Sequence, residues 1–242
     1  MDNFNIIILS FIAGAATFFG VWLGSRHNYG EKTAAFGASF AATIMLLISG
    51  VELIPASISD GGLIKSSIFV IIGVSLIAVA NYIVPHLHTF HDIKNCDQKC
   101  MLRASYLIAI GLVLHDFPEG FAIPASFGSS TSLGTVVIIS SFLHNIPEGY
   151  AMTVASRGIK GGFCYKSAAF STLASLSGAI LGIILIGNFA HINSIFLAVA
   201  AGAMLYISFH ELIPMALKHK EKTAMLWGAA VALILFFLLG LI

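Results

Sequence analysis

Long apolar stretches separated by short polar segments run through the whole chain, and eight of them are recognisable. Each has about the ~20 residues that a helix needs to cross the hydrocarbon core of a bilayer. No polar segment between them is long enough for a soluble domain. The pattern predicts an all-α membrane protein in which residues 1–242 form one transmembrane domain. The eight predicted helices cover approximately residues 5–24, 34–56, 67–85, 104–127, 132–155, 166–187, 193–216 and 223–241.

The composition supports a membrane location and excludes a soluble fold. Hydrophobic residues make up 58% of the chain and charged residues 10%, whereas soluble domains average roughly 25% charged residues. A net charge of +1 gives no indication of a nucleic-acid partner. We therefore expect a multi-pass protein of the cell (inner or plasma) membrane, surrounded by the lipid bilayer.

Lysines and arginines are concentrated on one side of the predicted bundle. With eight consecutive spans, alternate loops face the same side, and 11 of the 12 basic residues fall on one side, which leaves only Lys65 on the other. Cytoplasmic loops of membrane proteins carry an excess of Lys and Arg. The predicted orientation therefore places the basic loops in the cytoplasm and both termini on the extracytoplasmic side.

Two short motifs occur twice, at positions related about the centre of the chain. The central spans contain His-Asp-Phe-Pro-Glu-Gly at 115–120 and His-Asn-Ile-Pro-Glu-Gly at 144–149. Glu-Leu-Ile-Pro occurs at 52–55 in the second span and at 211–214 in the seventh. The two members of each pair lie in spans of opposite direction. This placement predicts an inverted repeat of three, two and three helices, an organisation that many transporters have.

Carboxylates inside the predicted spans have no basic partner within the bundle. Five acidic residues lie within spans, and no Lys or Arg lies well inside one. A buried carboxylate without a cationic partner takes up a proton or binds a metal ion. Chains of Glu and His also move protons, so a proton relay stays open, but the paired His-x-x-x-Glu spacing favours a metal. The five acidic residues are Glu52, Asp116, Glu119, Glu148 and Glu211.

The strongest candidate ligands are one His-Glu pair in each central span. A spacing of four residues directs both side chains of a pair from one helix face. Two such faces, opposed, would surround one point with two imidazoles and two carboxylates. These donors suit Zn²⁺, and also Fe²⁺, Mn²⁺, Co²⁺ or Cd²⁺. The predicted central ligands are His115, Glu119, His144 and Glu148.

Asp116 and Asn145 directly follow the two histidines. They could form a second, oxygen-rich metal site beside the first, and the alternative is that they only hydrogen-bond to the ligand histidines. Pro118 and Pro147 each remove one backbone hydrogen bond within a helix. In lipid, such a gap is tolerated where it is satisfied by other groups or lines a wet cavity, which supports a polar site at this depth.

Other polar residues lie nearer the two membrane surfaces. On the predicted topology, Glu52 is near the external end of the second span, where it either receives the metal or is only solvated at the helix end. His210 and Glu211 are near the cytoplasmic end of the seventh span, where we expect them to release it. The cytoplasmic segment after the third span either receives released metal or is a polar connector with incidental ligand residues. That segment contains His86, His88, His91, Cys96 and Cys100.

Taken together, the two central motifs, Glu-Leu-Ile-Pro in the second span and His-Glu-Leu-Ile-Pro in the seventh resemble the ZIP (Zrt/Irt-like) family of divalent-metal transporters. The match is best with its prokaryotic ZupT/GufA-like members, and the resemblance covers all eight spans. It implies transport into the cytoplasm, an elevator-like motion of the metal-carrying helices and a central site that can hold two metals. It also implies a homodimer, which many members form.

The chain departs from the family pattern at two positions. Asp116 stands where the motif of the fourth span commonly has Asn. Members with two metals often have a further Glu in the sixth span, but the corresponding residues 171–178 contain no carboxylate, and Ser175 occupies the approximate place. We therefore expect one well-defined central metal and a weaker second one.

The sequence thus predicts a carrier of divalent transition metals, with Zn²⁺ as the principal substrate and no separate cofactor. A passive metal-selective channel and an exporter stay open as alternatives. An intramembrane metalloenzyme is disfavoured, because zinc proteases have His-Glu-x-x-His and the segment after His210 continues to Met215 without a second His. Di-iron proteins have Glu-x-x-His, whereas here His precedes Glu. We therefore predict no enzymatic activity.

Overall fold

The computed structural model describes residues 2–26, 30–83, 98–156, 162–189, 192–218 and 220–241. These residues are helical apart from short connections, and no strand occurs among them. Helices satisfy their own backbone hydrogen bonds, which a chain in lipid requires. The elements are α1 (Asn3–Arg26), α2 (Glu31–Leu47), η1 (Ile48–Leu53), α3 (Ile54–Gly61), α4 (Leu63–Ile83), α5 (Gln98–Ser129), α6 (Thr131–Ala155), α7 (Phe163–Asn188), α8 (Asn193–Ile207), η5 (Ser208–Leu212), α9 (Ile213–Lys218) and α10 (Lys222–Leu239).

Each of the eight predicted ranges corresponds to one helical rod. Two rods are composite: α2, η1 and α3 together form Glu31–Gly61, and α8, η5 and α9 form Asn193–Lys218. Among the described residues, six rods are long and apolar enough to cross a membrane, and α5 and α6 are not counted with them. Both of these helices contain one of the two polar motifs. The prediction of an all-helical, multi-pass membrane protein is confirmed.

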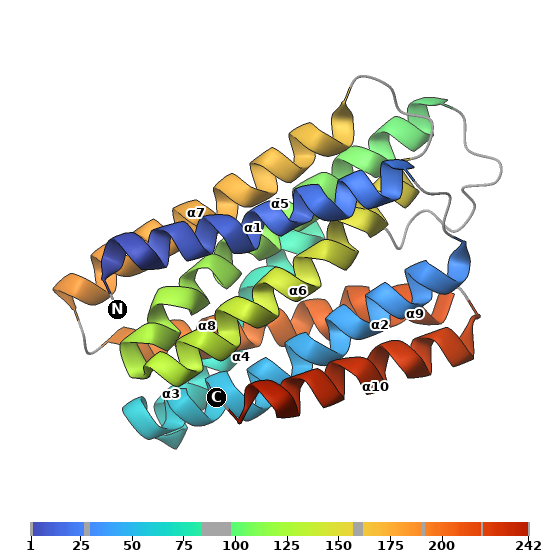
Figure 1. Cartoon of the computed structure of the whole chain (residues 1–242). Coiled ribbons are helices and arrows are strands. Elements are labelled where there is room, and N and C mark those ends of the chain that lie inside the picture. Colours follow the sequence, from blue (N-terminus) through green and yellow to red (C-terminus); the bar gives the residue numbers. More distant parts are fainter. Residues whose placement is uncertain are drawn as a thin grey trace.

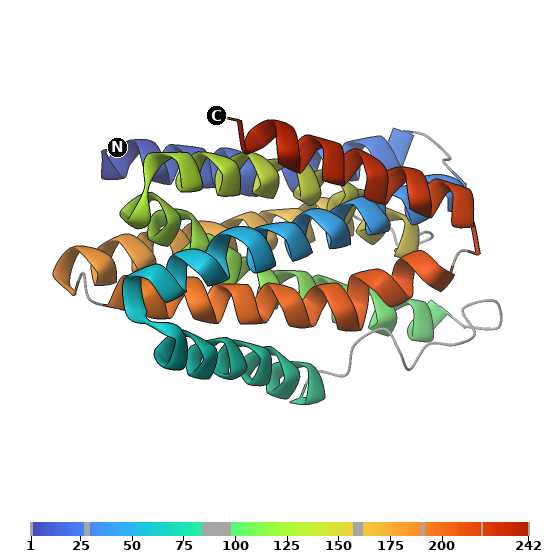
Figure 2. The same cartoon turned by 90° about the horizontal axis from the view of Figure 1, so that it is seen from below.

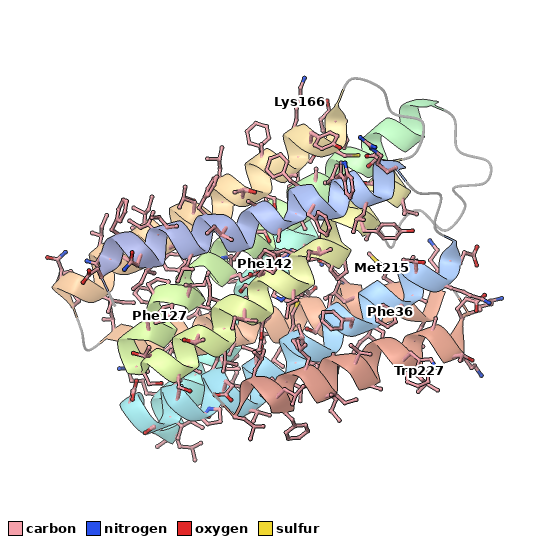
Figure 3. The ribbon with its side chains drawn as sticks, viewed as in Figure 1. Phe36, Phe127, Phe142, Lys166, Met215 and Trp227 are labelled. Atoms are coloured by element: carbon pink, nitrogen blue, oxygen red, sulfur yellow. The ribbon has the colours of Figure 1, made fainter. Side chains whose placement is uncertain are left out.

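The distribution of side chains also agrees with a membrane environment. Large apolar residues lie on the outside: Ile64 is 78% exposed, Trp227 65% and Phe237 64%. The interior combines Ala, Ile, Leu and Val with buried His, Asp, Glu and many Ser side chains. Figure 3 shows Trp227 and Lys166 pointing away from the bundle, Trp227 on α10 and Lys166 near the start of α7. An apolar exterior of this extent suits contact with lipid tails rather than water.

The rods run along one common direction and form two groups (Figure 1). α1, α5, α6 and α7 pack on one another, and α2 and α8 pack together with α10 and α4 on their outer sides. Contacts of α5 with α8 and of α2 with α6 join the two groups. Figure 2 shows α4 lying at the edge of the bundle. The two chain termini lie toward one end of the bundle, opposite the end at which α1 leads into α2.

Contacts between helices occur in matching pairs. α1 packs on α6 as α7 packs on α5, and α2 packs on α10 as α8 packs on α4. The motif glycines permit the first two contacts. A Cβ atom on Gly120 would lie 2.0 Å from the Ser175 carbonyl oxygen, and one on Gly149 would lie 2.1 Å from the Thr17 carbonyl oxygen. The backbones approach too closely at these two positions for any residue other than glycine.

A π-helical turn ends within each Glu-Leu-Ile-Pro motif, a feature that the sequence did not predict. η1 precedes Pro55 and η5 precedes Pro214, each within an otherwise α-helical rod. A proline removes a backbone N–H and crowds the carbonyl four residues earlier, and a local widening of the helix relieves this. π turns inside α-helices are frequent at functional sites. The match between the rods also extends further back than the tetrapeptide, since Ile-Ser-x-x-Glu-Leu-Ile-Pro occurs at 48–55 and at 207–214.

Candidate metal-binding site

The two central motifs face each other in the interior of the bundle. α5 and α6 run in opposite directions and contact each other. α5 contributes His115 and Glu119, and α6 contributes His144 and Glu148. All four side chains are buried, with 7% of His115 exposed and none of His144. The spacing of four residues places both members of a pair on one helix face, and in the structure this face points inward on both helices.

Each histidine contacts the glutamate of the opposite helix rather than that of its own. Nε2 of His115 lies 3.2 Å from Oε2 of Glu148. Nε2 of His144 lies 3.0 Å from Oε2 of Glu119. Two crossed His–Glu pairs thus connect α5 and α6, and their four donor groups come from both members of the repeat.

Several polar atoms at this site have no hydrogen-bond partner. Oε1 of Glu119, Oε1 of Glu148, Oδ1 of Asn145 and Nδ1 of His144 are all buried without one. Buried polar atoms in folded proteins are nearly always satisfied, and no lysine or arginine is buried among the residues whose side chains the structure describes. A bound divalent cation would satisfy the free oxygens and balance the carboxylate charge.

Asp116 belongs to the central cluster. Its Oδ1 lies 3.1 Å from Nε2 of His115, and its Oδ2 accepts a hydrogen bond from the Ser171 hydroxyl. His115, Asp116 and Glu119 offer ligand atoms that all lie within 4.8 Å of one another. This spread is compatible with one metal ion bound to an imidazole nitrogen and carboxylate oxygens.

Asn145 is oriented by the backbone of α1. Its Nδ2 donates a hydrogen bond of 2.9 Å to the carbonyl oxygen of Ala13, while its Oδ1 has no partner. The amide therefore acts as a structural group through its nitrogen and keeps an oxygen available as a ligand.

α7 contributes Ser171, a site residue that the sequence did not single out. Ser175 is buried and its hydroxyl has no partner, but the hydroxyl that contacts Asp116 belongs to Ser171, one helical turn earlier. The available signal was the row of hydroxyl residues on one face of α7, with Ser167 and Ser171 four residues apart and Ser175 four further on. The relative register of α5 and α7, which decides among the three, cannot be derived from spacing alone.

The peripheral candidates lie in the two rods that contain π turns. Glu52 lies in η1 and is partly buried. Glu211 lies in η5, and its Oε1 is 3.4 Å from Nδ2 of Asn81 on α4. The ring of His210 lies 4.8 Å from that of Tyr206, centre to centre. The segment with His86, His88, His91 and Cys96 lies outside the described residues, as does the side chain of Cys100.

Comparisons with known proteins agree with these features. A family model described as "ZIP Zinc transporter" matches residues 85–242. A "Zinc transporter ZupT" of Shigella dysenteriae serotype 1 (strain Sd197) is 34% identical over 227 residues, which covers 87% of this chain and 86% of that protein. Proteins of the same name from Escherichia coli O7:K1 and Salmonella newport are 34% and 33% identical over 224 residues, with the same coverage.

Proposed function

Because the chain belongs to the ZIP family of zinc transporters, we propose that it moves divalent transition-metal cations across the membrane, with Zn²⁺ as the principal substrate. The observation that carries this proposal is the pair of crossed His–Glu contacts between α5 and α6, buried without a basic partner in the described part of the chain. Imidazole nitrogen and carboxylate oxygen are the ligands of Zn²⁺, and Fe²⁺, Mn²⁺, Co²⁺ and Cd²⁺ accept the same donors. In this proposal the metal is the cargo and not a resident cofactor.

The central residues act as exchangeable ligands. Nε2 of His115 lies between carboxylate oxygens of Asp116 and Glu148, at 3.1 Å and 3.2 Å. Without metal, a proton on this nitrogen can bridge to either oxygen. An arriving cation takes the place of that proton, and binding therefore releases protons. The free Oε1 atoms of Glu119 and Glu148 and the free Oδ1 of Asn145 provide further coordination.

The arrangement of the helices supports alternating access. The metal-binding helices α5 and α6 belong to one packed group, which touches the other group mainly through α5 with α8 and α2 with α6. The matching helix contacts support an inverted repeat of three, two and three spans, and such repeats provide two related access states around one site. We propose that all eight rods cross the membrane and that the first group moves against the second.

Direction and topology complete the proposal. The excess of basic residues on one side supports cytoplasmic loops there and extracytoplasmic termini. With this topology Glu52 receives the metal from outside, and His210 with Glu211 releases it into the cytoplasm. The relatives' name, zinc transporter, supports transport rather than an enzymatic reaction. A homodimer is the assembly we propose, and light scattering of the detergent-purified protein tests it.

Transport of radiolabelled Zn²⁺ into proteoliposomes tests the function. Wild type should show saturable uptake, inhibited by Cd²⁺, Fe²⁺ and Mn²⁺, and His144→Ala and Glu119→Ala should abolish it. Lys166→Ala, at an exposed position on α7, is the control and should transport normally. Unlabelled metal inside the vesicles should accelerate uptake by a carrier and not by a channel. Full activity of both site variants would overturn the site assignment.

A further inference from the structure

The central site contains two corresponding contacts that differ in chemistry. On one side Gly120 packs against Ser175, and four residues earlier on the same two helices Asp116 contacts Ser171. On the other side Gly149 packs against Thr17, and four residues earlier Asn145 contacts Ala13. Residues 116 and 145 thus occupy equivalent places, as do residues 171 and 13.

At positions 116 and 145, the side chain is complementary to the hydrogen-bonding group on the neighbouring helix: an acceptor faces a donor, and a donor faces an acceptor. Ser171 offers a hydroxyl donor, and residue 116 is a carboxylate, which only accepts. Ala13 has no polar side chain and offers only a carbonyl acceptor, and residue 145 is an amide, whose nitrogen donates. In each case one polar atom of the side chain is held by the neighbouring helix and one oxygen is left over. For Asp116 that oxygen lies beside His115, and for Asn145 it is buried and unpartnered.

We propose that Ser171 is a positioning residue for metal binding: its hydroxyl holds Oδ2 of Asp116, so that Oδ1 stays beside Nε2 of His115 as a ligand. This inference rests on the proposed function, since it assumes that the central cluster binds the transported metal. It also explains why the chain carries its extra carboxylate at 116 rather than at 145. A carboxylate at 145 would face the Ala13 carbonyl, two acceptors without a hydrogen between them, in a buried place where an unsatisfied group is costly.

Zinc affinity and the absorption spectrum of Co²⁺ bound to the purified protein test Ser171. The d–d bands of Co²⁺ report the number and kind of its ligands, which a purely structural role of Ser171 would not alter. Ser171→Ala should weaken Zn²⁺ binding by about 10-fold to 100-fold, the usual effect of removing a hydrogen bond to a metal ligand. It should also shift the Co²⁺ bands in the same direction as Asp116→Ala does.

The equivalent contact on α6 supplies a second test that does not require Ser171 to be changed. Asn145→Asp should weaken Zn²⁺ binding or destabilise the metal-free protein. Adding Ala13→Ser should restore whichever property was lost, because the new hydroxyl recreates the Asp116–Ser171 contact. Ala13→Ser alone is the control and should bind as wild type does.

The outcomes separate this inference from the proposed function. If wild type binds Zn²⁺ but Ser171→Ala leaves the affinity and the Co²⁺ bands unchanged, Ser171 has no positioning role, although the site stands. If Ser171→Ala does not fold, the double variant decides: failure of Ala13→Ser to rescue Asn145→Asp would overturn the inference. Binding that survives in His144→Ala would instead count against the proposed function.

Discussion

At the scale of single residues, the central site brings together groups for which, on the proposed function, protons and metal compete. Two imidazoles and three carboxylates, those of Asp116, Glu119 and Glu148, lie in a region without buried basic residues in the described ranges. Their contacts are short enough for shared protons, as between His144 and Glu119 at 3.0 Å. Charge balance at this site therefore requires either bound protons or a bound cation.

This competition predicts weaker metal binding in acid. Neutral imidazole and ionised carboxylate bind the metal and their protonated forms do not, so affinity falls as the pH is lowered. Each proton released on binding changes the affinity by about tenfold per pH unit. Equilibrium dialysis of Zn²⁺ between pH 5.5 and 7.5 measures this, and an unbuffered titration counts the protons. An affinity that does not change with pH would contradict ligation by the His–Glu pairs.

The number of bound metals follows from the side chains at 116, 145 and 175. Wild type should bind one Zn²⁺ tightly and a second only weakly, because residue 175 is Ser and residue 145 an amide. Ser175→Glu adds a carboxylate on the face of α7 that packs against α5, and it should raise the tight stoichiometry to two. Metal analysis after dialysis gives both numbers, and two tight metals in wild type and variant alike would refute this assignment.

At the scale of elements, the sequence predicted where the helical rods lie, but not the π turns within them or the register between neighbouring rods. A run of about 20 apolar residues defines a span by itself, and all eight ranges lie along observed rods as far as the structure describes them. The π turns at η1 and η5 were not predicted, because the number of residues per turn before a proline depends on packing as well as on sequence. The shared face of His115 and Glu119 follows from their spacing, but the crossed partners Glu148 and His144 depend on the register of α5 against α6.

The glycine contacts make a direct prediction about stability. Gly120→Ala and Gly149→Ala should each destabilise the protein by about 1–3 kcal/mol, since a methyl group there overpacks the contact with Ser175 or Thr17. Gly187→Ala is the matched control, because a Cβ atom at this helical position meets nothing within 4 Å. It should be neutral or slightly stabilising. Thermal unfolding in detergent compares the three glycine variants. Equal unfolding temperatures would show that the backbones at Gly120 and Gly149 do not approach their neighbours as closely as described.

At the scale of the whole molecule, the two helix groups are connected differently at the two ends. At the end nearer the termini, Ser129 of α5 donates to Asp60 at 2.6 Å and accepts from Asn193 at 3.0 Å. The ring of Phe121 on α5 stacks on Phe196 of α8, with centres 5.2 Å apart. The equivalent positions at the other end follow from the repeat, in which Glu52 corresponds to Glu211, 159 residues later. The counterparts of Asn193 and Phe196 are then Ala34 and Gly37, which provide neither a polar group nor a ring.

This asymmetry predicts that the described state is closed at the end of Ser129, the outer end on the proposed topology. Removing the hydroxyl by Ser129→Ala breaks both hydrogen bonds between α5 and the second group and should increase the time spent open outward. In a protein whose three cysteines are replaced, a new cysteine at buried Ser126 should then react faster with a membrane-impermeant maleimide added from outside. Thr135→Ala is the control, because that hydroxyl bonds only within α6, to Thr131. The stacked rings of Phe121 and Phe196 remain in Ser129→Ala. Adding Phe196→Ala to this variant should therefore accelerate labelling of the new cysteine further. Equal labelling rates in the parent protein, Ser129→Ala and the double variant would mean that the outer contacts do not control access to the metal site.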